Sequence, residues 1–136
     1  FTIKDETLLD SKLKKAQQFL NIAESISKNN PEIIILQALL HTAYIAFDGS
    51  KYGMTLAGKV TQLYHKALKI APNNPRVVLA NAEWNIGSAK YFKQPITPFC
   101  KDVKHAIKLS KKEKITTLFY PKFQLQRAEA ILKKCH

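Results

Sequence analysis

The chain has 136 residues, of which 46% are hydrophobic, and it contains only 4 Gly and 6 Pro. This size and composition suit one folded domain, residues 1–136, and argue against a linker or a disordered segment. The formal charge is +12, yet Arg76 and Arg127 are the only arginines among 22 basic residues. Because reading of bases relies heavily on the planar guanidinium, nucleic acid is disfavoured as a partner.

The longest apolar stretch, residues 33–47, is shorter than the roughly 20 residues that cross a bilayer. We therefore predict a buried helix there and no transmembrane segment. The chain begins with Phe1, so we expect a mature or trimmed product in which a signal peptide would not be visible.

The first predicted helix is capped by Asp10 or Ser11 and stops at Asn29-Asn30. Its apolar residues recur every three or four positions, which is typical of a buried helix face. They are Leu13, Ala16, Leu20 and Ala23, with Phe19, Ile22 and Ile26 widening the stripe. Pro31 suits the first turn of a second helix, from Glu32 to about Phe47, which Asp48-Gly49 ends.

After a predicted loop through residues 51–53, a third helix carries the clearest buried pattern, with Val60, Leu63, Tyr64, Ala67 and Leu68 on one face. Further helices are predicted over residues 76–91, 99–110 and 121–134. No segment shows the alternation of a strand, so the predicted class is all α, with about six helices arranged as antiparallel pairs.

Three of these helices end alike, in Ala-Glu-Ser-Ile-Ser from Ala23, Ala-Leu-Lys-Ile-Ala from Ala67 and Ala-Ile-Lys-Leu-Ser from Ala106. The first two are followed by Asn-Asn-Pro and a new helix. This is an internal repeat: a small residue lets two helices approach closely, and the turn reverses the chain.

Tyr64, Ala67 and Pro72, followed by Asn-Asn-Pro at 73–75, resemble the second helix and turn of a tetratricopeptide repeat. The resemblance implies a short right-handed solenoid. Its parts would be a second helix over about 11–30, repeats over 31–74 and 75–114, and a capping helix over 121–134. The alanine spacing exceeds the usual period of about 34 residues, so we expect extra residues in turns around 49–57 and 92–98.

The segment from Gly49 to Arg76 is also similar to bacterial cell-envelope proteins of this type that have a long loop within the repeat. That resemblance implies a periplasmic or exported scaffold that binds a protein or peptide and has no catalytic activity. A cytoplasmic location is the alternative.

In tetratricopeptide-like solenoids the first helix of each pair lines the concave, peptide-binding surface. The resemblance therefore implies a binding face made of Glu32, Ile35, Leu39 and Thr42 from one repeat, and Arg76, Leu79, Glu83 and Ile86 from the next. In the alternative, the last helix or inserted loops cover these residues and fill the groove.

If the fifth and sixth helices are antiparallel neighbours, Cys100 at the start of one lies near Cys135 at the end of the other. A disulfide there would close a loop of about 35 residues and contribute on the order of 3 kcal/mol. Two free thiols in a reducing compartment are the alternative.

The fifth helix also carries a lysine stripe, which consists of Lys101, Lys104, Lys108 and Lys112. The simplest interpretation is the solvated face of an amphipathic helix. Alternatively, the stripe meets an anionic surface.

No spacing predicts a catalytic set, a cofactor loop or a metal site. The tetratricopeptide-like resemblance implies a protein or peptide interaction scaffold of the cell envelope. A structural module without a ligand is the alternative, and binding of anionic surfaces is a third possibility. A monomer is slightly favoured.

Overall fold

The computed structural model describes residues 3–113 and 121–135, with side-chain exposure described from Glu6 onward. These residues form only helices and turns, which confirms the predicted all-α class of packed helix pairs. The six helices are α1 (Ile3–Ile26), α2 (Pro31–Phe47), α3 (Gly49–Ile70), α4 (Pro75–Tyr91), α5 (Thr97–Lys112) and α6 (Leu125–Lys133).

The chain divides into two compact units, where the sequence predicts a single domain. The N-terminal unit, residues 1–70, holds α1 to α3, and the C-terminal unit, residues 71–136, holds α4 to α6. The boundary falls at the turn before the second Asn-Asn-Pro motif. Each unit therefore contains one helix hairpin and one further helix.

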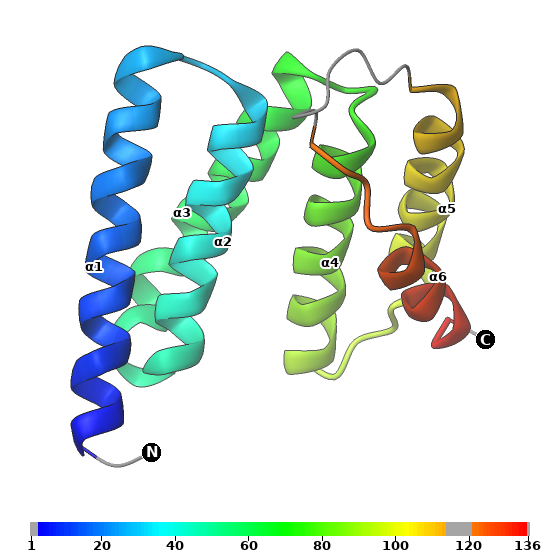
Figure 1. Cartoon of the computed structure of the whole chain (residues 1–136). Coiled ribbons are helices and arrows are strands. Elements are labelled where there is room, and N and C mark those ends of the chain that lie inside the picture. The colour runs from blue at the N-terminus through cyan, green and yellow to red at the C-terminus, as the bar shows by residue number, and fades with distance from the viewer. Residues whose placement is uncertain (1–2, 114–120, 136) are drawn as a thin grey trace. The chain divides into compact units, whose positions relative to one another are not determined.

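In the N-terminal unit, α2 packs against both α1 and α3 (Figure 1). Of the predicted buried face of the third helix, Val60, Tyr64 and Ala67 are buried at the centre of this core, while Leu63 and Leu68 are half-buried. Ala38 of α2 is also fully buried, and its small side chain allows close approach of the neighbouring helices. The rest of the core is apolar and consists of Leu13, Ile34, Ile35 and Leu40.

Two predictions about the first helix are wrong. The helix begins at Ile3 and runs through Asp10, so Asp10 does not cap its start. The Asp10 carboxylate instead forms an ion pair with Lys14 one turn later, with Oδ2 and Nζ 3.0 Å apart. Phe19, Ile22 and Ile26 do not widen the buried stripe, because all three side chains are exposed on the opposite face. Only one stripe of α1 packs against α2.

The loop predicted over residues 49–57 is instead the first part of α3. Asp48 alone joins the two helices: its N–H donates to Tyr44 O of α2 at 3.0 Å, and its Oδ1 accepts the Lys51 N–H of α3 at 3.1 Å. The Tyr52 ring then packs edge-on against Tyr44, with centroids 5.1 Å apart. The additional residues of this repeat therefore lengthen α3 and form no loop.

A helix begins after each Asn-Asn-Pro motif, as predicted, and the structure adds an asparagine cap to each. Asn30 Oδ1 accepts the Glu32 N–H at 2.9 Å, and Asn74 Oδ1 accepts the Arg76 N–H at 3.0 Å. Each following proline occupies the first turn, where an N–H would have no intrahelical partner. The repeated Asn-Asn-Pro motif is thus a helix cap that occurs at the starts of α2 and α4.

In the C-terminal unit, α4 packs against α5 and α5 against α6 (Figure 1). Val77, Val103 and Ala128, one from each helix, are fully buried. The predicted start of α6 at Pro121 is wrong, since the helix begins at Leu125. The sequence places Tyr120 before Pro121, and tyrosine lacks the short acceptor of the asparagine caps.

Candidate functional site: a pocket in the C-terminal unit

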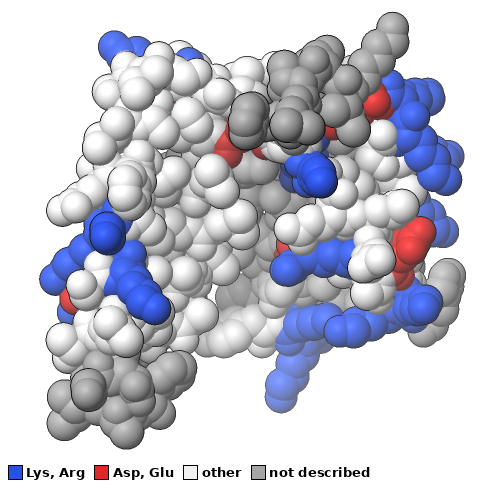
Figure 2. All heavy atoms as spheres, viewed as in Figure 1, with Lys and Arg blue, Asp and Glu red and all other residues white. Residues whose placement is uncertain are grey.

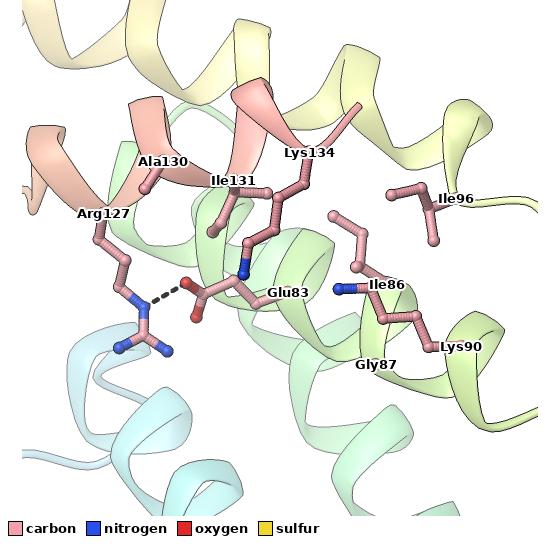
Figure 3. Close-up of a pocket in the computed structure, with 9 residues that line it drawn as sticks. All are labelled: Glu83, Ile86, Gly87, Lys90, Ile96, Arg127, Ala130, Ile131 and Lys134. Carbon is pink, nitrogen blue, oxygen red and sulfur yellow. Dashed lines mark hydrogen bonds and ion pairs between the residues drawn. The ribbon is translucent and has the colours of Figure 1, made fainter. Parts of the chain in front are cut away.

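A pocket of about 350 Å³, open to solvent, lies between α4 and α6. Its walls come from one face of α4, from the turn before α5 and from α6 with the residue after it (Figure 3). The lining residues are Glu83, Ile86, Gly87, Lys90, Ile96, Arg127, Ala130, Ile131 and Lys134.

One ion pair spans the two helices at one edge of the pocket. The Arg127 guanidinium of α6 donates from Nε to Glu83 Oε1 of α4 (Figure 3). This hydrogen bond and the neighbouring negative charge raise the pKa of Arg127. Glu83 is therefore engaged within the protein and would not repel an incoming anion as a free carboxylate would.

Two further cations stand at the pocket. Lys90 near the end of α4 and Lys134 just after α6 are exposed, and their ammonium ends point toward the space between the helices (Figure 3). Together with Arg127 they set three positive charges against the single carboxylate of Glu83. The pocket therefore has an electrostatic preference for an anionic ligand.

The rest of the lining is apolar. Ile86 is buried at the base, and Ile96 and Ile131 are half-buried. Gly87 adds no side chain to the α4 wall, and a Cβ atom there would meet nothing within 4 Å. The pocket thus offers an apolar surface beside cationic groups, which suits a ligand with both an apolar part and a negative charge.

A disulfide holds the α6 wall in place. Cys100 in the first turn of α5 is bonded to Cys135 just after α6, with an S–S distance of 2.09 Å and Cα atoms 6.2 Å apart. This is the pairing predicted from the helix order. Because Cys135 follows Lys134 directly, the bond also anchors the chain that carries one of the pocket lysines.

The residues predicted for a concave face lie in both units. On α2, Ile35 is buried, Leu39 is exposed, Glu32 is half-buried, and Thr42 donates its hydroxyl hydrogen bond to Ala38 O at 2.9 Å. Of these four side chains only that of Leu39 is exposed, at 45%.

On α4 the predicted residues are mostly covered. Arg76 Nη1 donates to Glu113 Oε1 at 2.6 Å, and Leu79 is buried. Glu83 and Ile86 are the two that line the pocket.

The lysine stripe lies on the outer face of α5. All four of its lysines are exposed, while Cys100, Val103 and Ala106 of the same helix are buried. Blue side chains cover much of the surface over α4 to α6 in Figure 2. This is the face that a solvated amphipathic helix would have, and it adds to the positive potential of the C-terminal unit.

Sequence reasoning missed Lys90, Ile96, Arg127, Ile131 and Lys134. They are far apart in the chain, and no spacing links α4 to α6. One signal was present: if Cys135 pairs with Cys100, then Ile131 and Lys134 come close to Ile96, four residues before Cys100.

Within residues 3–113 and 121–135, no three His, Cys, Asp or Glu side chains form a group that could hold a metal ion. Over the same ranges, no helix is both long and apolar enough to cross a membrane. Comparison of the chain with family models, with curated proteins and with solved structures finds no match.

Proposed function

We propose that this chain is a non-catalytic binding module of tetratricopeptide-like helix pairs. Its ligand would be an acidic peptide segment of a partner protein that carries an apolar side chain. The observation that carries the proposal is the pocket between α4 and α6, in which three cations surround an isoleucine-lined space. An apolar side chain of the peptide would contact Ile86, Ile96 and Ile131, and its carboxylates would pair with Lys90 and Lys134.

We also propose an exported, periplasmic setting for this module. The Cys100–Cys135 disulfide supports it, because disulfides form and persist in oxidising compartments and are rare in the cytosol. The bond has a direct use in this setting, since it holds the nine-residue α6 where it completes the pocket.

The experiment is a nuclear magnetic resonance titration of the oxidised protein with short peptides containing leucine between two pairs of glutamates. Expected are chemical-shift changes at Gly87, Lys90, Ile96 and Ile131 and binding that weakens as salt rises, because ion pairs at an open site are screened. Shift changes confined to other surfaces would refute the pocket as the site. Absence of any binding would favour the structural module.

Two variants test the pocket directly. Gly87→Leu places a side chain in the open space of the α4 wall, and it should weaken peptide binding at least tenfold without unfolding the protein. Gly58→Leu is the matched control, because Gly58 is also helical and has open space around its Cβ position, but it lies on α3 of the other unit. Equal affinities of the two variants would contradict the proposal.

The lysine stripe favours a second candidate function, binding of an anionic surface such as acidic lipid headgroups. Its four exposed lysines lie in a unit with 13 Lys and Arg against four Asp and Glu. Replacing Lys101, Lys104 and Lys108 with glutamine should abolish capture by acidic liposomes if this function holds. The same change should leave peptide binding at the pocket within about twofold.

A further inference from the structure

The outer face of α1 is unusually apolar for a helix surface that meets solvent. Leu8, Phe19, Ile22 and Ile26 are between 55% and 80% exposed. They lie opposite the face that packs on α2, where Leu13 is buried and Gln17 and Gln37 exchange two amide hydrogen bonds of 2.8 Å. α1 is therefore apolar on two opposite sides, and only one of them is covered within the unit.

The exposed residues follow the spacing of a helix-packing seam. Including the exposed lysines between them, the positions are Leu8, Lys12, Lys15, Phe19, Ile22 and Ile26, which alternate in steps of four and three. We call this set the outer seam. Alternating steps of four and three place one residue per turn along a narrow stripe, which is the pattern that meets a second helix in a coiled coil.

We infer that the outer seam docks an amphipathic helix of a partner protein, with acidic side chains opposite Lys12 and Lys15 and apolar ones opposite Phe19, Ile22 and Ile26. The seam spans 18 residue steps, which is about 27 Å of helix at 1.5 Å per residue. A partner helix of about 20 residues covers it. Two lysines within the seam determine the register and the charge of the partner, because they would otherwise be placed against apolar groups.

A second copy of this chain fits the seam less well. In a parallel pair Lys12 and Lys15 face their own counterparts, and in an antiparallel pair they face apolar residues of the seam, which contains no acid. The chain also carries a net charge of +12, so two copies repel each other. Charge complementarity therefore points to an acidic helix of a different protein.

A lipid surface is also a poorer match. Helices that lie in a membrane interface have a broad apolar face with lysines on the polar side. The outer seam is narrow and contains two lysines among its apolar residues. The inference does not rest on the pocket proposed above, since the seam belongs to the N-terminal unit.

The probe is a synthetic 21-residue peptide with leucines in the same four-three spacing and glutamates at the two positions that meet Lys12 and Lys15. A matched peptide carries lysines at those two positions. Isothermal titration calorimetry with the full chain should show binding of the glutamate peptide and at least tenfold weaker binding of the lysine peptide. Equal binding of both peptides, or of neither, would overturn the inference.

Variants of the protein locate the contact. Phe19→Ser with Ile22→Ser should weaken binding of the glutamate peptide at least tenfold without loss of folding, since both side chains are exposed. Met54→Ser is the control, because Met54 is an almost fully exposed apolar residue of α3 outside the seam, and its replacement should change the affinity less than twofold.

A charge swap provides the sharpest test. Lys12→Glu with Lys15→Glu should reverse the preference, so that the lysine peptide binds at least tenfold more tightly than the glutamate peptide. A preference that stays unchanged contradicts the inference. Sedimentation showing that the wild-type chain dimerises through Phe19 and Ile22, or stronger binding to liposomes than to the glutamate peptide, would assign the seam to another occupant and also overturn it.

Discussion

The two units use the same plan of one helix hairpin and one further helix, but different interactions hold the further helix in place. α1 has 24 residues and packs on α2 through apolar and amide contacts. α6 has nine residues, too few for an independent helix, and is held by the Cys100–Cys135 disulfide and the Arg127–Glu83 ion pair. The comparison teaches that a short helix can form a pocket wall when side chains fix its two ends.

The charges of the two units differ as well. The N-terminal unit has nine lysines against six Asp and Glu, a net charge of +3. The C-terminal unit has 13 Lys and Arg against four Asp and Glu, a net charge of +9. Its helices repel one another more strongly, so its disulfide and its ion pairs matter more to its stability.

Removal of the disulfide should cause the largest change in the relative stability of the two units. The double variant Cys100→Ser, Cys135→Ser frees a loop of 35 residues and should destabilise the C-terminal unit by about 3 to 4 kcal/mol. Trp84 is the single tryptophan of the chain and lies in this unit, so its fluorescence during urea unfolding measures the change. Hydrogen exchange at Val60 and Tyr64 should stay unchanged, and faster exchange there would contradict separate stabilisation of the units.

Two ion pairs among the described residues of the C-terminal unit should contribute unequally to its stability. The side chains of Arg76 and Glu113 are only 11% and 18% exposed, so Arg76→Ala leaves a mostly buried carboxylate and should cost about 2 kcal/mol. The Arg127 side chain is 62% exposed, and Arg127→Ala should cost only about 0.5 kcal/mol because solvent screens that pair. Urea unfolding followed at Trp84 compares them, and equal losses would refute this ranking.

The repeated asparagine caps should have similar effects in both units. Asn30→Ala and Asn74→Ala each remove the acceptor for the first free N–H groups of a helix, at a cost of about 1 kcal/mol. Thermal unfolding followed by circular dichroism measures each loss, with Asn73→Ala as a control on an exposed neighbour. A cost confined to one of the two caps would show that the repeat is not equivalent in the two units.

The smallest effect is a pH dependence of the N-terminal unit. Burial and, to a lesser extent, the charge of Lys59 lower the pKa of His41 below its usual 6.5. The unfolded chain therefore protonates His41 more readily than the folded chain does. The contribution of neutral His41 to the stability of the folded state is complete above pH 6.5 and is lost as pH falls through the lowered folded pKa. His41→Gln should unfold at urea concentrations that depend less on pH between 7.5 and 5. An identical dependence in both proteins would exclude His41 as the cause.

Local chemistry made much of the fold predictable from the sequence. The Asn-Asn-Pro motifs identify two helix starts because a cap and a proline act on neighbouring residues. Val60, Tyr64 and Ala67 identify a buried face because three- and four-residue steps return to one side of a helix. Helix order identified Cys100 and Cys135 as a candidate pair, with two free thiols as the alternative, and the structure has the disulfide.

The failures came from residues whose role the sequence pattern alone does not fix. Asp48-Gly49 looks like a helix end, and it is one, but Asp48 also starts the next helix, and the Tyr44–Tyr52 contact accompanies this junction. Phe19, Ile22 and Ile26 have the spacing of a core, yet the unit covers only the opposite face of α1. The pocket was missed because its walls meet across more than 40 residues of chain, as the Glu83–Arg127 pair shows.

The single-residue junction at Asp48 makes the length of the chain critical at this point. One residue inserted early in α3, after Gly49, would turn the rest of that helix by about 100° relative to its cap. Val60, Tyr64 and Ala67 would then leave the face that is buried in the N-terminal unit. In the turn between α4 and α5, residues 92–95 are exposed, so a change in length before Ile96 should be absorbed more easily. Insertions and deletions should therefore be better tolerated at residues 92–95 than at Asp48, where the α2–α3 hairpin should keep its length even where its sequence drifts.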